Sequence, residues 1–104
     1  MILYNVTVNI DEAVHDEWLT WMKTEHIPAV LATGMFIENR ICLIHGETEG
    51  GISYAIQYVA PDKAHYDRYQ VEFAPALQHE HGTRYAGKFV AFRTVLEIIH
   101  QSRS

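Results

Sequence analysis

Apolar and polar residues alternate over residues 2–10, which predicts a β-strand at the start of the chain. One face collects Ile2, Tyr4, Val6, Val8 and Ile10, and the other collects Leu3, Asn5, Thr7 and Asn9. A period of two with several β-branched residues is typical of a strand whose apolar face is buried. Asn9 and Asp11 then provide helix N-cap side chains, so a helix is expected to begin near residue 12.

Apolar residues recur with the helical period over residues 12–26. With about 100° of rotation per residue, one third of the circumference collects Val14, Trp18, Trp21, Met22 and Glu25. Pro28 lacks an N–H and restricts the residue before it, so this helix is expected to stop or bend there. A short turn over residues 28–32, closed by Gly34, is expected to follow.

The rest of the chain carries further signals of the same kind. They predict a strand over 35–46, a Gly-rich hairpin loop over 46–51, a strand over 52–59, a helix over 61–82 and a last strand over 88–99. Pro75 is expected to bend the second helix, and Gly82 is expected to close it. The second and last strands are apolar on both faces, which indicates burial on both sides.

The order βαββαβ predicts an α+β, ferredoxin-like fold, with a four-stranded antiparallel sheet and two helices on one face. The other sheet face then needs a cover, and stacking against a second copy provides one. We therefore expect a homodimer, in the arrangement called a dimeric α/β barrel. Residues 1–100 are expected to form a single domain, followed by a polar tail over 101–104.

Four segments carry a resemblance to a known family. They are Tyr4-Asn5-Val6-Thr7-Val8, Trp18-Leu19-Thr20-Trp21-Met22, Phe73-Ala74-Pro75 and Gly87-Lys88-Phe89-Val90-Ala91-Phe92-Arg93-Thr94. With them the chain resembles an uncharacterised bacterial family, associated with the Bacteroidetes and known as a domain of unknown function, within the dimeric α/β-barrel superfamily. That superfamily includes small monooxygenases that need no metal. The resemblance implies the fold and a dimer but no activity, and it carries over one position, His26 of the His26-Ile27-Pro28 segment.

Composition narrows the classes of function. The chain has 104 residues, a net charge of −5 and only scattered Lys and Arg, which disfavours nucleic acid as a partner. No apolar run approaches the roughly 18 residues of a membrane span, and the first residues lack the pattern of a secretory signal. The single Cys42, in an apolar run, is expected to be a buried small hydrophobe, and a reducing, cytoplasmic location is expected.

Candidate catalytic chemistry is confined to Glu25 and His26, at the end of the first helix. If the helix persists, Glu25 faces the sheet, where a carboxylate needs a donor or has its pKa raised. Donors on the sheet are Tyr4, Tyr54, Tyr58, Arg40 and Arg93. The alternative, which we favour, is that the helix unwinds and both Glu25 and His26 face water.

The ligand-binding candidates are mainly aromatic. They are Trp18, Trp21, Tyr54 and Tyr58, with Arg40 and Arg93 as possible anion-holding groups. The competing interpretation is that the aromatic residues form core. Arg93 shares a strand face with Glu97, and Arg40 shares one with Glu38, so for the arginines we favour cross-strand or cross-dimer ion pairs. The seven histidines lack zinc-site spacing, so no metal is expected.

Two functions therefore stay open at this point. One is a homodimeric small-molecule-binding module. The other is a cofactor-free, monooxygenase- or isomerase-like enzyme that acts on a small aromatic or enolisable substrate, with Glu25 or His26 as base. An open cavity that reaches His26 would favour the enzyme, whereas a filled space between helix and sheet would exclude it.

Overall fold

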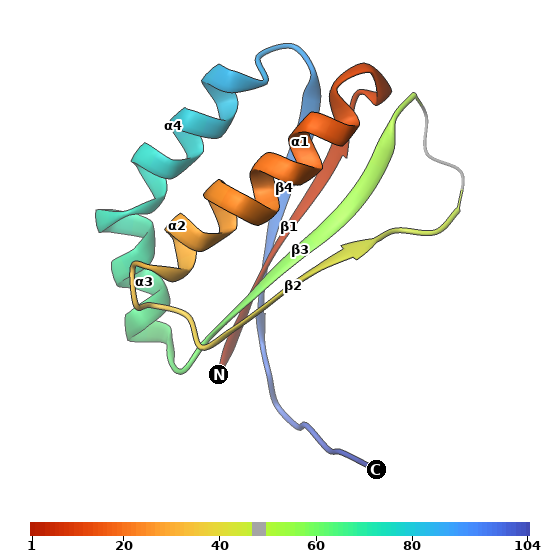
Figure 1. The fold of residues 1–104 in the computed structure, drawn as a ribbon. Helices are drawn as coiled ribbons and strands as arrows, with labels where there is room; N and C mark the ends of the chain where they lie inside the picture. Colours follow the sequence, from red (N-terminus) through yellow and green to blue (C-terminus); the bar gives the residue numbers. More distant parts are fainter. Residues whose placement is uncertain (47–49) are drawn as a thin grey trace.

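The computed structural model describes residues 1–46 and 50–104, and it shows an antiparallel four-stranded sheet with helices across one face (Figure 1). The strands are β1 (Ile2–Ile10), β2 (Glu38–Leu43), β3 (Ile52–Ala60) and β4 (Phe89–Glu97), in the spatial order β2-β3-β1-β4. The helices are α1 (His15–Trp21), α2 (Ile27–Leu31), α3 (Lys63–Glu72) and α4 (Ala74–Arg84). The predicted α+β, ferredoxin-like fold is confirmed.

The register of β1 explains where the core lies. Tyr4 is opposite Tyr58 of β3, and Val8 is opposite Tyr54, so the apolar faces of both strands point the same way. Trp18 and Trp21 cover this face from the first helix, and both side chains are buried, which confirms that they belong to the core. The apolar face of β1 and the apolar side chains of the first helix thus pack together in one hydrophobic layer.

The first helical segment differs from the prediction at its end. Pro28 does not stop it: a short 3-10 turn (Glu12–Val14), α1, a π-helical turn (Met22–His26) and α2 succeed one another without a break. The N–H of Ile27 donates to the carbonyl of Met22, five residues back. Pro28 then stands in the first turn of α2, where its missing N–H costs little. The short turn predicted over 28–32 is present as α2, with Gly34 at φ +78° past its end, but no stop in the helix precedes it.

The second helical segment is divided into α3 and α4. Phe73 leaves helical geometry between them, with φ −121° and ψ −40°, and Pro75 lies in the first turn of α4. The predicted bend therefore occurs just before Pro75. Gly82 does not close the segment, since α4 continues to Arg84. Gly87, with φ +74°, lies in the turn after α4.

Strands β2 and β4 are shorter than predicted. β2 covers Glu38–Leu43 rather than 35–46, and β4 covers Phe89–Glu97 rather than 88–99. Met35 and Phe36 are buried although they precede the strand, because the Phe36 ring packs on Tyr4, Tyr58 and Tyr69. The predicted hairpin loop over 46–51 includes residues 47–49, which lie outside the described residues.

Among the described residues, no helix or second sheet covers the outer face of the sheet (Figure 1), and Gln101 and Arg103 of the tail line a hollow there together with Arg40 and Gln57. Val90 and Phe92 of β4 are 72% and 62% exposed there. Cys42 is also exposed, so its predicted burial is wrong for the single chain, because β2 is an edge strand with one covered face. Within the described residues, no helix has the length and apolar character needed to cross a bilayer.

Candidate functional site

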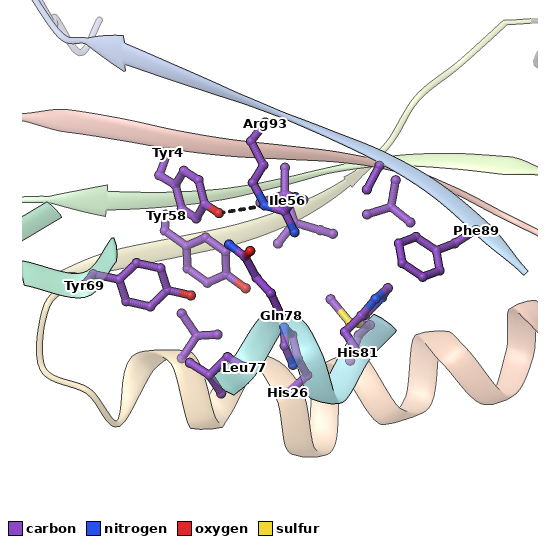
Figure 2. A pocket seen from close by; sticks show the side chains of 15 residues that line it. Tyr4, His26, Ile56, Tyr58, Tyr69, Leu77, Gln78, His81, Phe89 and Arg93 are labelled. Atoms are coloured by element: carbon purple, nitrogen blue, oxygen red, sulfur yellow. Dashed lines mark hydrogen bonds between the residues drawn. The ribbon is translucent and has the colours of Figure 1, made fainter. Parts of the chain in front are cut away.

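A pocket lies between the sheet and the helices, on the side of β4 (Figure 2). Its free volume is about 40 Å³. Its polar lining comes from β1, β3, β4, the π-turn, α3 and α4, namely Tyr4, His26, Tyr58, Tyr69, Gln78, His81 and Arg93. Arg93 is the one exposed residue of this lining, so the pocket opens to solvent beside its guanidinium.

His26 reaches the pocket because of the π-turn. The extra backbone residue rotates the end of the helix, so His26 rather than Glu25 points toward the sheet. The imidazole stacks on Trp21, with 5.0 Å between ring centroids and 25° between the planes. Burial lowers the pKa of His26 to about 4, so this side chain is uncharged at neutral pH. Within the described residues, its Nδ1 is the one buried side-chain polar atom that lacks a hydrogen-bond partner.

His81 enters the pocket from α4 and is held more firmly. The indole Nε1–H of Trp18 donates to His81 Nε2 at 2.9 Å, which places the ring proton of neutral His81 on Nδ1. Burial is the main cause that lowers the pKa of His81 to about 4, and the charges of His26 and Arg93 lower it further. The two imidazole centroids are 5.7 Å apart.

Three tyrosines and an arginine form the opposite wall, as Figure 2 shows. Burial raises the pKa of Tyr4, Tyr58 and Tyr69, so each hydroxyl keeps its proton at neutral pH. Arg93 Nε donates to the Tyr4 hydroxyl at 3.1 Å. This bond, together with the charge of Arg93, opposes the effect of burial on the pKa of Tyr4. The wall therefore consists of hydrogen-bond donors around one cation.

The structure separates the residues that the sequence suggested for the site. His26, Tyr58 and Arg93 line the pocket, whereas Trp18 and Trp21 support it from behind through His81 and His26. Glu25 is exposed, as favoured, but the expectation that His26 also faces water is wrong, because the π-turn directs it inward.

Two other candidates lie away from the pocket. The Tyr54 hydroxyl bonds to His15 Nε2 at 2.7 Å, at the other end of the core layer. Arg40 is exposed on the outer sheet face, where its Nε donates to Gln57. Among the described residues, neither Arg40 nor Arg93 forms the within-chain ion pair suggested with Glu38 or Glu97.

Sequence reasoning missed Tyr69, Gln78 and His81 as pocket residues. In the sequence His81 is one of seven histidines that lack zinc-site spacing. It lies four residues after Leu77, which continues the apolar stripe of the second helical segment, and this spacing is the signal that would have found it. Gln78 has no such signal. In the described part of the chain, no three His, Cys, Asp or Glu side chains lie together as metal ligands would.

The chemistry available to this site is the binding of a small polar group. Two uncharged imidazoles face three protonated hydroxyls and a guanidinium within an otherwise apolar cavity. An enclosed aromatic ring needs a cavity of about 150 Å³, so the present space admits a few non-hydrogen atoms rather than a ring. A larger ligand has to displace side chains at the mouth, where Arg93 and Gln78 lie.

Comparison with known proteins places the chain in a family. Residues 1–99 match the family described as Domain of unknown function (DUF4286). The chain belongs to this family. No functionally curated protein matches the sequence. The predicted resemblance to a domain-of-unknown-function family is therefore confirmed.

Solved structures with the same fold are similar over nearly the whole chain. HapK from Hahella chejuensis has a TM-score of 0.76 at 11% identity, covering 100% of this chain and 98% of its own. A dimeric ferredoxin-like protein from an uncultured marine organism has a TM-score of 0.71 at 13% identity, and the match covers 100% of both chains. SnoaB, a cofactor-independent oxygenase from Streptomyces nogalater, has a TM-score of 0.67 at 11% identity, and the match covers 96% of this chain and 94% of SnoaB. At these identities the likeness shows the fold alone.

Proposed function

We propose that this protein is a small-molecule-binding module whose ligand occupies the pocket between His26 and Arg93. The observation that carries the proposal is the orphaned Nδ1 of His26, at the end of a π-turn that directs the imidazole into the pocket. A buried polar atom without a partner costs about 1–3 kcal/mol. π-turns and unpaired buried groups of this kind concentrate at functional sites, where a ligand supplies the missing partner.

Tryptophan fluorescence tests this proposal, because both tryptophans of the chain contact pocket histidines. We expect titration with small oxygen compounds (acetate, acetamide and acetone) to change the emission of the wild-type protein saturably. Ala91→Leu fills the pocket from β4 and should abolish the change, whereas Ala29→Leu, on the exposed side of α2, should keep it. If no compound changes the wild-type emission, or if Ala91→Leu responds like the wild type, the proposal is wrong.

A second candidate is a cofactor-free enzyme acting on an enolisable substrate. It is favoured by the two uncharged imidazoles that lie across from Arg93, because a C–H proton could pass to His26 Nδ1 while the electron pair moves to an oxygen held by the guanidinium. SnoaB and a putative antibiotic biosynthesis monooxygenase from Bacillus cereus are structural neighbours. An imidazole with a pKa of about 4 is a weak base, so binding ranks first.

We also infer that two copies stack through their outer sheet faces. Val90, Phe92 and Leu96 of β4 form the exposed apolar part of this face. Its central polar groups are already paired: Arg40 donates to Gln57, which donates to Asn5, which in turn donates to Thr7. A second copy that covers this face finds Gln57, Asn5 and Thr7 already paired, and it has to supply acceptors for the Nη groups of Arg40.

The mass in solution tests the dimer. Light scattering at micromolar concentration should give twice the 12.0 kDa of the chain, and Phe92→Glu should give the monomer mass. A monomeric wild type would contradict the stacking. For the location we propose the cytoplasm, because an exposed free thiol such as Cys42 suits a reducing compartment.

A further inference from the structure

The charges around the pocket are unusually one-sided. Of the fifteen described residues that line it, Arg93 alone carries a formal charge at neutral pH, and none of the fifteen is Asp or Glu. The chain as a whole carries a net charge of −5. The pocket is therefore a positive site in an acidic protein. Arg93 lies at the mouth of this cavity, and the part of its field that passes through the apolar interior is screened by water less than it would be on the open surface.

Arg93 also keeps most of its hydrogen-bonding capacity. A guanidinium has five N–H donors, and the structure shows one of them, at Nε, donating to the Tyr4 hydroxyl. None of the ion pairs of the described residues includes Arg93. Glu97 lies on the same face of β4 without pairing with it. The forked Nη groups are thus available for an acceptor that arrives with a ligand.

Neighbouring groups are set to donate as well. The Tyr4 oxygen already accepts from Arg93, so its own proton is left for another acceptor. Trp18 occupies Nε2 of His81, so the proton that His81 can give is on Nδ1. Donors around one cation, with no carboxylate in the lining, match a ligand whose oxygens accept hydrogen bonds and carry negative charge.

We propose that the pocket is selective for a small monoanion, a carboxylate or enolate of a few carbon atoms, whose charged oxygens bind Arg93 and Tyr4. The apolar end of the ligand then lies against Val6, Ile56 and Ala91, on the sheet side of the pocket. The free volume of about 40 Å³ limits that end to a few atoms. This inference rests on the proposed function and adds the chemical class of the ligand.

Matched acid–amide pairs test the selectivity. Acetate and acetamide, and propanoate and propanamide, are nearly equal in shape, so the difference between the members of a pair isolates the charge. Binding is followed by the NMR shifts of the two indole N–H groups at constant ionic strength. We expect the wild type to bind each acid at least tenfold more tightly than its amide. Arg93→Gln should abolish this preference, and Arg93→Lys should keep part of it, because it keeps the charge but loses the fork.

Arg68→Gln is the matched control, because it removes an exposed arginine of α3 that lies outside both the pocket lining and the outer sheet face. It should bind like the wild type. Equal binding of acid and amide by the wild type, or a preference that survives Arg93→Gln, would overturn anion selectivity while leaving the pocket as a binding site. A loss of preference in Arg68→Gln equal to that in Arg93→Gln would also overturn it, because the effect would then be one of overall charge. If neither member of any pair binds, the proposed function fails as well.

Discussion

Each of the two helical segments that cover the sheet contains a proline, but the backbone before the proline differs between them. The prolines are Pro28 in the first and Pro75 in the second, and each proline stands in the first turn of a new α-helix. The first segment stays continuous from Glu12 to Leu31, whereas the second breaks at Phe73 and changes direction (Figure 1). The difference lies in the residues that precede each proline.

Before Pro28 the backbone takes in one extra residue as a π-turn. The turn rotates the end of the segment about the helix axis, so Glu25 faces solvent and His26 faces the pocket. Before Pro75 the chain leaves helical geometry, and α4 then proceeds regularly to carry His81 inward. The comparison shows that a proline can change the rotation of a helix or its direction. Here each outcome brings one imidazole to the same cavity.

The largest expected effect comes from deleting one residue in each segment. Loss of Glu80, in regular α4, rotates the residues after it by about 100° and removes His81 and Tyr85 from the core, so we expect a loss above about 4 kcal/mol or no folding. Loss of Thr24, an exposed residue in the π-turn, converts that turn to a regular α-helix with His26 still inward, and should change stability by less than about 1 kcal/mol.

Urea unfolding followed by circular dichroism measures both deletions. Equal destabilisation by the two would show that the π-turn is not an added residue in an otherwise regular helix. A folded Glu80-deletion protein with wild-type stability would contradict the fixed rotation of α4.

The second effect is a pH dependence that both segments share. His26 and His81 have pKa values of about 4 in the folded chain, below the usual 6.5. Because these pKa values are lowered, the unfolded state takes up protons first as the pH falls. Stability is therefore full above about pH 6.5 and declines toward pH 4, by about 3 kcal/mol for each imidazole.

His26→Phe should remove about half of this decline, since it keeps a ring on Trp21 and removes one titrating group. Urea midpoints between pH 7 and pH 4 measure it. A wild-type stability that stays constant over this range would contradict the burial of both imidazoles in uncharged form.

The smallest expected effect is a difference in stability at neutral pH between variants of the two histidines. His81→Phe leaves the Trp18 N–H buried without an acceptor and should cost about 1–3 kcal/mol. His26→Phe removes a nitrogen that has no partner, together with the cost of burying it, so we expect no loss of stability and a gain of up to about 1–3 kcal/mol. Thermal unfolding at pH 7.5 compares them. If His26→Phe lowers the stability more than His81→Phe does, then His81 is not the histidine held by a hydrogen bond and His26 is not the one without a partner.

Much of the fold could be predicted because it derives from periodicity. Alternation over residues 2–10 sets which side chains of β1 face the helices, and the partners in β3 are set by its own alternation. The ends of elements were less predictable. Gly82 was expected to close a helix, but a glycine in open space at the helix surface only weakens it, and α4 continues past it.

The candidate site was predictable only in part. His26 was named from its place beside Pro28, but its direction depends on the π-turn, for which no residue type is a signal. His81 became important through a hydrogen bond to Trp18, sixty-three positions earlier in the chain, and one sequence does not show such a pairing. Cys42 was misjudged because an apolar run in a strand indicates two covered faces, whereas one chain covers one.

The strand order has a consequence for the time course of synthesis. β1 is made first but lies in the middle of the sheet, and its neighbour β4 is made last, so that Ile2 pairs with Glu97. The edge of β1 that pairs with β4 therefore stays unpaired on the ribosome until residue 97 has emerged. The bond from Arg93 to Tyr4 spans 89 positions and closes among the last. We expect the binding pocket to be complete only after translation of β4, and nascent chains that stall earlier to expose a strand edge prone to association.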